Sequence, residues 1–297
     1  MEFPLLSRPG AVAGDGVDAG VAAHYGDPLR EQRAGLPVVD RSHREVVRVG
    51  GEDRLSWLHS LTTQHLTALP PGKWTEALVL SPHGHVEHHL TLVDDGTAVL
   101  AHVEPGTAGA LLEFLDSMRF LLRVTPERVA DLAVLTVGGA DRLVPRDRLV
   151  ASFDEAVAAG GTPAGTWAYE ALRVAARRPR LGFETDHRTI PNELGWLETA
   201  VHLDKGCYRG QETVARVHNL GRPPRRLVLL HLDGSVDRLP AHGDAVEWEG
   251  AAVGFVGTAA RHHELGPIAT ALVKRNTPDD APLTVAGIAA AVALETV

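Results

Sequence analysis

The chain has 297 residues, a length that accommodates two or three modules sharing one body. Its formal net charge of −9 argues against a protein that coats nucleic acid or an anionic membrane, because both partners attract a positive surface. No run approaches the roughly 20 apolar residues that span a bilayer, and residues 1–6 lack the features of a secretory signal. The single cysteine excludes an intrachain disulfide and a site with four cysteine ligands from one chain. We therefore expect a cytoplasmic protein without a membrane partner.

The N-terminal segment lacks a clear periodicity of apolar residues, whereas the sequence after it shows the spacing of strands and helices. Residues 1–35 are rich in Gly, Ala and Asp without a clear period, which predicts a loosely held N-terminal arm. Residues 46–49 predict a strand, and Leu55, Leu58 and Leu61 recur at helical spacing after it. Short apolar runs divided by turn residues then predict strands over 77–80, 86–93 and 98–103.

The clearest predicted helix follows residues 105–107 and presents an apolar face made of Leu111, Leu112, Leu115 and Met118. Further strands are predicted over 121–124, 132–137 and 169–175, and a second helical segment within 144–161. This order favours an α+β fold over residues 36–225, with helices packed on one face of an antiparallel sheet.

The character of the sequence changes after Pro223 and Pro224. Short apolar runs, divided by Gly, Pro and Asp, occupy residues 227–232, 245–248, 252–256, 268–273 and 289–294. This cadence predicts a small C-terminal β-barrel over residues 226–297.

Residues 205–212 read Lys-Gly-Cys-Tyr-Arg-Gly-Gln-Glu and hold the only cysteine. Lys205 and Arg209 each lie two residues from Cys207, and cations that converge on a thiol lower its pKa below the ordinary value of about 8.5. Two glycines permit a tight turn or a close approach to a ligand. The alternative is an inert, buried cysteine, which is how most free cysteines behave. The polar neighbours favour a reactive thiol.

This octapeptide closely resembles the K-G-C-Y-x-G-Q-E signature of the YgfZ family, a branch of the glycine-cleavage T-protein superfamily. Weaker similarities follow the family order at residues 39–43, 49–54, 57–64 and 191–193. The resemblance implies folate binding and an association with iron–sulfur cluster assembly or repair. It also implies a T-protein-like fold: two interleaved ferredoxin-like α/β modules within residues 36–225, a C-terminal small β-barrel, and a tetrahydrofolate site at the centre.

The resemblance also implies roles for individual residues. Glu193, in a P-x-E element, matches the glutamate that holds the pterin ring in the T-proteins, and a carboxylate suits paired N–H donors. Arg222 is the best match to an arginine that contacts the folate, although Arg225 and Arg226 compete with it. The further cofactor-binding candidates are Tyr208, Gly210, Gln211, Glu212 and Glu87.

One departure from the T-protein pattern bears on catalysis. The T-proteins carry an aspartate on the strand after a G-G-I turn, and here Glu87 or His88 falls near that place. A glutamate moves the carboxylate outward by one methylene, which disturbs a reactive geometry. Aminomethyl transfer is therefore not the favoured activity.

Two other clusters carry weaker signals. His83, His85, His88 and His89 include imidazoles that share a strand face, but no acidic ligand is spaced to complete a zinc site, so an ordinary polar face is preferred and no metal is predicted. Residues 216–226 form a basic segment that would suit RNA phosphates, yet it lacks interleaved aromatic residues. A contact to the folate tail is the simpler interpretation.

The leading hypothesis is a tetrahydrofolate-binding accessory factor that supports iron–sulfur proteins or their assembly factors, with Cys207 as its reactive group and Lys205 beside it. The first alternative is a folate-dependent aminomethyltransferase or demethylase. The second is an accessory protein for tRNA modification, which would place nucleic acid among the partners.

Overall fold

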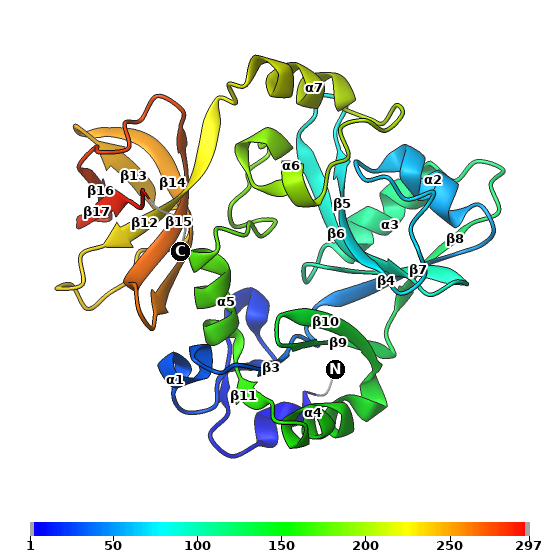
Figure 1. Ribbon diagram of the computed structural model, residues 1–297, viewed down its shortest axis with the longest axis horizontal. Helices are drawn as coiled ribbons and strands as arrows, with labels where there is room; N and C mark the ends of the chain where they lie inside the picture. The colour runs from blue at the N-terminus through cyan, green and yellow to red at the C-terminus, as the bar shows by residue number, and fades with distance from the viewer. Residues whose placement is uncertain (1–2, 295–297) are drawn as a thin grey trace.

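The computed structural model describes residues 3–294 and has three modules arranged as a ring (Figure 1). A five-stranded sheet with two helices lies on one side, a four-stranded sheet lies below it, and a closed β-barrel lies on the other side. The predicted α+β class with a C-terminal barrel is confirmed. Within residues 3–294, no helix has both the length and the apolar character needed to cross a bilayer.

The five-stranded module is antiparallel throughout, with the strand order β5-β6-β7-β4-β8. Its strands are β4 (Glu45–Gly50), β5 (Trp74–Leu80), β6 (Val86–Asp94), β7 (Ala98–Val103) and β8 (Thr125–Val129). Helices α2 (Arg54–Leu61) and α3 (Ala108–Ser117) contribute Leu58, Leu111 and Leu115 to a core shared with one face of this sheet. The other face of the sheet is therefore left free for a different neighbour.

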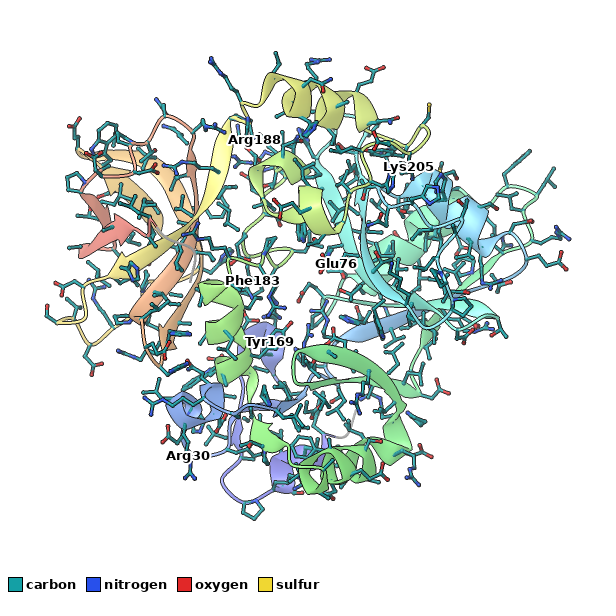
Figure 2. The ribbon with its side chains drawn as sticks, viewed as in Figure 1. Arg30, Glu76, Tyr169, Phe183, Arg188 and Lys205 are labelled. Carbon is teal, nitrogen blue, oxygen red and sulfur yellow. The ribbon has the colours of Figure 1, made fainter. Side chains whose placement is uncertain are left out.

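Strand alternation decides which side chains reach that second face. Ala77 and Val79 on β5 point into the helix-covered core. Side chains at alternate positions point to opposite faces, so Glu76 points away from the helices. Glu76 pairs in register with Thr91 on β6 and lies near the centre of the ring, where the second face is therefore polar (Figure 2).

The four-stranded module has the order β10-β9-β3-β11. Its strands are β3 (Pro37–Asp40), β9 (Leu132–Val137), β10 (Ala140–Pro145) and β11 (Thr162–Ala164), and only β11 pairs in parallel, with β3. A 3-10 turn, η3 (Arg146–Arg148), leads into helix α4 (Leu149–Ala158), whose Leu149 and Phe153 are buried in its core. Helix α5 (Thr166–Ala175) runs from this module to the barrel, where it contacts β14 (Ala251–His262).

The N-terminal segment is folded onto the four-stranded module, and the expectation of a loose arm was wrong. It contains η1 (Pro4–Ser7), β1 (Val12–Ala13), η2 (Gly16–Asp18), β2 (Ala22–His24) and α1 (Pro28–Gln32). Leu5 is buried in the same core as Phe153. The buried carboxylate of Glu31 accepts hydrogen bonds from the backbone N–H groups of Tyr25 and Gly165. A few buried anchors thus hold a segment whose composition suggested disorder.

The C-terminal module is a closed barrel with the order β12-β15-β14-β13-β16-β17. The strands other than β14 are β12 (Arg225–Leu232), β13 (Ala245–Trp248), β15 (Gly266–Lys274), β16 (Leu283–Val285) and β17 (Ile288–Val292). Pairing of β12 with β17 closes the barrel, which leaves its sheet without a free edge. Its interior is filled by Val, Leu, Ile and Ala side chains.

Three short elements connect the α+β region to the barrel: η4 (Pro191–Glu193), α6 (Trp196–Thr199) and α7 (Gln211–Leu220). Two predicted strands in the α+β region were wrong. Residues 169–175 belong to helix α5, because Ala168, Ala171, Val174 and Ala175 recur at helical spacing as its buried side. Residues 121–124 form a loop before β8, in which Leu121 is exposed and has a positive φ of 40°.

Candidate functional site

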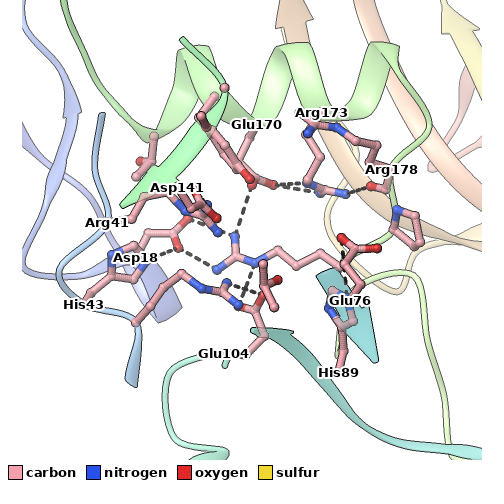
Figure 3. Close-up of a pocket in the computed structure, with 18 of the residues that line it drawn as sticks. Asp18, Arg41, His43, Glu76, His89, Glu104, Asp141, Glu170, Arg173 and Arg178 are labelled. Atoms are coloured by element: carbon pink, nitrogen blue, oxygen red, sulfur yellow. Dashed lines mark hydrogen bonds and ion pairs between the residues drawn. The ribbon is translucent and has the colours of Figure 1, made fainter. Parts of the chain in front are cut away.

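A cavity of about 290 Å³ lies at the centre of the ring, between the two sheet modules and helix α5. Figure 3 shows its charged walls at close range. All of its lining residues lie between Asp18 and Arg180 in the sequence: Asp18, Arg41, His43, Arg44, Trp74, Glu76, His89, Thr91, Glu104, Gly139, Ala140, Asp141, Thr166, Tyr169, Glu170, Arg173, Arg178, Pro179 and Arg180. The volume is close to the lower end of the range of ligand pockets, roughly 300–1,000 Å³. The cavity is therefore a candidate binding site, enclosed by charged and aromatic side chains from three parts of the fold.

One wall of the cavity is the polar face of the five-stranded sheet. Trp74 and Glu76 come from β5, and His89 and Thr91 come from β6. Each pair is separated by two residues, so both members of a pair project from the same side of their strand. This wall offers an indole ring, a carboxylate, an imidazole and a hydroxyl to anything that enters.

Another part of the wall is held together by a chain of ion pairs centred on Arg180. Its guanidinium contacts Asp18 at 2.7 Å and Glu104 at 2.9 Å. Glu104 also receives Arg44 at 2.5 Å. Burial alone would raise the pKa of Glu104, but the two arginines outweigh that effect and hold it at about 2. These carboxylates are therefore ionised and fully engaged with cations.

A second set of pairs fixes the part of the wall formed by β10 and α5. Arg41 donates to Asp141 at 3.1 Å and lies over the ring of Tyr169, with 4.3 Å to the ring centroid. Arg173 donates to Glu170 at 2.7 Å and to Glu184 at 3.1 Å. Buried charges of this kind are tolerated only when they are paired, and the Arg41–Asp141 pair joins segments that are 100 positions apart in the sequence.

One acidic residue and one arginine of the cavity take no part in these arginine–carboxylate pairs. Five arginines and five acidic residues line the cavity, and within residues 3–294 Glu76 and Arg178 are the two that no ion pair joins to an arginine or a carboxylate. Glu76 accepts a hydrogen bond from the Thr199 hydroxyl at 2.5 Å, and its other oxygen lies 3.7 Å from His89 Nε2. Burial alone would raise the pKa of Glu76, but His89, Thr199 and the charge of Arg178 outweigh it and hold the pKa at about 2.

Two buried imidazole nitrogens in the cavity wall also lack a hydrogen-bond partner among the described residues. They are Nε2 of His89 and Nδ1 of His43. The ring of His89 packs on Trp196, with 4.7 Å between the ring centroids, which fixes its orientation. Buried polar atoms without partners are rare in folded proteins because each costs free energy, so they indicate a place where a ligand or water supplies the missing bond.

The octapeptide that dominated the sequence analysis lies outside the cavity. Lys205 is buried and donates to the backbone carbonyl groups of His59, Thr62 and Gln64 at the end of α2. Burial lowers the pKa of Lys205 to about 8. Figure 2 labels Lys205 beside α2, whereas Glu76 and Tyr169 lie nearer the centre of the ring. The ammonium group of Lys205 therefore anchors the loop to α2 through its hydrogen bonds to these carbonyl oxygens.

The neighbours of Lys205 divide into exposed and packed positions. Cys207 is exposed on the loop between α6 and α7. Tyr208 is packed in a core with Trp196 and Val214, and burial raises its pKa to about 12. Gln211 donates weakly to the Lys205 carbonyl at 3.4 Å, and Glu212 is exposed at the start of α7. The loop thus presents its thiol on the outer surface.

Gly210 has a packing role that explains its residue type. It adopts a positive φ of 82°, and a Cβ atom there would lie 2.6 Å from the Ser81 carbonyl oxygen and 2.8 Å from Gly84 Cα. The turn at residues 81–84 therefore lies directly against the start of α7. Only glycine accepts both the backbone conformation and the close approach.

Glu193 is buried outside the cavity, and its carboxylate is already satisfied. Arg225 donates to both of its oxygens at 2.8 Å, and the Ile190 N–H donates at 3.1 Å. Arg222 is exposed beyond the end of α7, so the arginine that meets Glu193 is Arg225. A pterin ring would have to displace Arg225 to reach Glu193 in this arrangement.

Glu87 and the four histidines near it separate onto different faces. Glu87 is partly exposed and pairs with Arg209 at 3.2 Å. His88 lies beside Phe114 of α3, on the helix-covered side, whereas His89 lines the cavity. Across residues 3–294, no three His, Cys, Asp or Glu side chains are arranged to hold a metal ion.

The sequence analysis did not single out Trp74, Glu76 or Arg178. Trp74 and Glu76 directly precede the predicted strand 77–80, and the structure places them at the N-terminal end of β5. Arg178 had no local signal, since nothing in a cluster of arginines tells which one lacks a partner in the fold.

Comparison with known proteins gives the family context. No protein-family model matches the chain. A putative chloroplastic transferase of Arabidopsis thaliana is 26% identical over 251 residues, and the match covers 67% of this chain and 56% of that relative. An aminomethyltransferase of Synechococcus elongatus is 31% identical over 280 residues, covering 76% of this chain and 73% of the relative. The tRNA-modifying protein YgfZ of Photorhabdus laumondii is 32% identical over 162 residues, covering 54% of this chain and 40% of the relative.

A solved structure agrees with these matches at the level of the fold. The glycine cleavage system aminomethyltransferase T of Bartonella henselae superposes with a TM-score of 0.83 at 18% identity, covering 99% of this chain and 96% of that chain. The YgfZ resemblance is thus partial in length, and the aminomethyltransferase matches extend further. The chain belongs to the aminomethyltransferase superfamily, that of the T-protein of the glycine cleavage system.

Proposed function

We propose that this protein binds tetrahydrofolate in the central cavity. The observation that carries the proposal is the charge pattern of the cavity, in which every acidic residue except Glu76 is paired with an arginine, and every arginine except Arg178 is paired with a carboxylate. A folate has complementary groups at its two ends, namely a donor-rich pterin ring and an acidic tail. A carboxylate that no arginine holds suits the N–H donors of the pterin, and a guanidinium that no carboxylate holds suits the tail carboxylate.

The aromatic groups of the cavity support the same ligand class. Trp74 and Tyr169 line it from opposite modules, so a flat ring that enters between the sheet and α5 meets an aromatic side chain on either side. Aromatic rings favour stacked or edge-to-face contacts with other aromatic groups. The relatives named as aminomethyltransferases make a one-carbon cofactor a reasonable occupant of this fold.

We further propose that the protein acts as an accessory factor through the exposed thiol of Cys207. Glu87, near the place of the T-protein aspartate, is paired with Arg209 and lies outside the cavity, which argues against aminomethyl transfer. The K-G-C-Y-R-G-Q-E motif favours a role with iron–sulfur proteins. A single thiol supplies one ligand, so any cluster would need its other ligands from a partner.

Two other functions have support from the comparisons. The aminomethyltransferase relatives favour a transferase, which would pass the carbon of an aminomethyl donor to tetrahydrofolate, so that methylenetetrahydrofolate forms stoichiometrically while ammonia and the remainder of the donor are released. The relatives named as tRNA-modifying proteins favour an RNA-related role, which would appear as tRNA binding that weakens steeply with salt. Either function would replace the proposed accessory role and would leave the proposal of folate binding unchanged.

Anaerobic calorimetric titration with tetrahydrofolate tests the central proposal. Wild-type protein should bind one equivalent, and Arg178→Ala should bind more weakly because the tail carboxylate loses its cation. Arg222→Ala, which removes an exposed arginine outside the cavity, is the matched control and should bind like wild type. If titration of the wild-type protein with tetrahydrofolate gives no heat of binding, folate binding is refuted.

A further inference from the structure

Three histidines form a cluster beside the loop that carries the octapeptide, outside the central cavity. His59 belongs to α2, His65 follows that helix, and His202 precedes Lys205 on the loop after α6. The rings of His59 and His65 meet edge to face, with 4.8 Å between their centroids, and the centroid of the His202 ring lies 5.3 Å from that of His65. Neither the proposed folate site nor the proposed role of the Cys207 thiol uses these imidazoles.

His59 closes the loop at the end of α2 through a hydrogen bond that requires its neutral form. The backbone N–H of Leu66 donates to His59 Nδ1 at 3.2 Å, and the Leu66 side chain is buried in the core of the five-stranded module. A neutral imidazole that accepts at Nδ1 carries its proton on Nε2, whereas the cation carries a proton on both nitrogens. Protonation of His59 therefore replaces the acceptor with a donor that faces the Leu66 N–H.

The segment that His59 closes is also the one that holds the octapeptide loop. The buried ammonium group of Lys205 donates to three backbone carbonyl groups between His59 and Gln64. The backbone N–H of His202 donates to the carbonyl oxygen of Thr63 at 3.0 Å. Because these four acceptors come from one short segment, a movement of that segment would release the octapeptide loop.

The groups whose charge acts on His59 are all basic. They are Lys205, His65 and His202, and within residues 3–294 no carboxylate is among them. Burial and these three neighbours lower the pKa of His59 from its ordinary value of 6.5. The closed loop therefore binds the proton less readily than a released loop would. It is favoured above about pH 6.5 and loses stability as the pH falls below that value.

From this geometry we propose that His59, His65 and His202 form a proton-sensitive latch on the octapeptide loop. The latch is closed while His59 is neutral and accepts the Leu66 N–H. A proton on His59 removes that hydrogen bond and sets a second cation beside Lys205, so the loop leaves its carbonyl acceptors. The pH thereby regulates how the loop presents its thiol, whether or not the cavity holds a folate.

A spin label on Cys207 reports the state of the latch, because Cys207 is the only cysteine in the chain and is exposed. The electron paramagnetic resonance spectrum should gain a more mobile component as the pH falls from about 8 to about 5, mainly below about 6.5. Each pKa unit by which the closed loop disfavours the proton changes the ratio of the two components about tenfold.

Two substitutions assign the transition to the latch. His59→Asn offers a side-chain oxygen in place of Nδ1 but does not titrate, so the labelled variant should keep the less mobile spectrum throughout. His231→Asn, which replaces an exposed histidine on β12 of the barrel, is the matched control and should show the wild-type transition.

Two measurements on the wild-type protein make the test independent of these substitutions. The amide NMR resonance of Leu66 should shift with the same midpoint as the label mobility, because this N–H loses its acceptor. Far-UV circular dichroism should stay constant, which separates local release from global unfolding. The proposal is overturned if the label mobility does not change over this pH range, if His59→Asn shows the wild-type transition, or if the mobile component appears only together with a loss of circular dichroism.

Discussion

Arg225 and Glu193 form a bidentate ion pair that links β12, the first strand of the barrel, to η4. The Arg225 Nε and Nη2 atoms each lie 2.8 Å from a different oxygen of the Glu193 carboxylate. Because Glu193 is almost completely buried, the pair cannot exchange its partners for water. This geometry makes Glu193 a structural group in the first instance.

We expect Arg225→Ala to reduce the free energy of unfolding by about 3–5 kcal/mol, because it leaves a buried carboxylate unpaired. Arg222→Ala should change it by less than about 0.5 kcal/mol, as is usual for an exposed residue. Urea unfolding followed by fluorescence measures both. Equal stabilities of the two variants would show that the pair does not hold the connection, and Arg225→Ala combined with Glu193→Gln should recover part of the loss.

The contact between Gly210 and Gly84 predicts a strong difference between two glycines of the octapeptide. Gly210→Ala should reduce the free energy of unfolding by about 1–3 kcal/mol, because the new methyl group meets Ser81 and Gly84 and the positive φ is strained. Gly206→Ala has open space around its Cβ position and should be tolerated. Thermal unfolding of the two variants checks this, and similar melting temperatures would contradict the packing.

The buried Glu104 predicts a specific acid dependence of stability. Its pKa in the folded protein is about 2, below the ordinary value of 4.5, so the folded state binds the proton less readily than the unfolded state. The stabilisation is therefore complete above about pH 4.5 and is lost as the pH falls toward 2. Glu104→Gln should unfold more easily at neutral pH and show a shallower decline in this range. A decline as steep as that of wild type would contradict the role of Glu104.

Exposure of Cys207 predicts rapid reaction of one thiol per chain. An aromatic disulfide reagent should modify the folded protein completely without denaturant, and Cys207→Ser should not react. Saturation with tetrahydrofolate should leave the rate unchanged, because Cys207 does not line the cavity. Protection by tetrahydrofolate would instead place the thiol at the folate site.

The architecture was largely predictable from local patterns, and the exceptions have identifiable causes. Residues 169–175 suggested a strand because Tyr169 and Val174 are of residue types enriched in strands. The helix is stabilised by tertiary contacts on both sides, including the buried Arg173, whose charge hides the helical period of the buried face. On β5, only residues 77–80 looked like a strand, because both faces of that part are buried. Glu76 therefore seemed to lie outside the sheet.

The cavity was not predictable because its network joins residues that are far apart in the sequence. Arg180 and Asp18 are 162 positions apart, and Arg180 and Glu104 are 76 apart. No local spacing reveals such partners, and the pairing is what singles out Glu76 and Arg178.

Lys205 shows that closeness in sequence can also mislead. Its closeness to Cys207 in sequence suggested a shared site, but the fold directs its ammonium group to the end of α2.

Locating bound tetrahydrofolate directly is the most decisive measurement. A crystallographic difference map of the protein grown with tetrahydrofolate should show the pterin ring in the central cavity beside Glu76 and His89, with the tail directed to Arg178. Density for the folate outside that cavity, for instance against Glu193 with Arg225 displaced, or on the surface near Cys207 or Arg222, would contradict the proposed site.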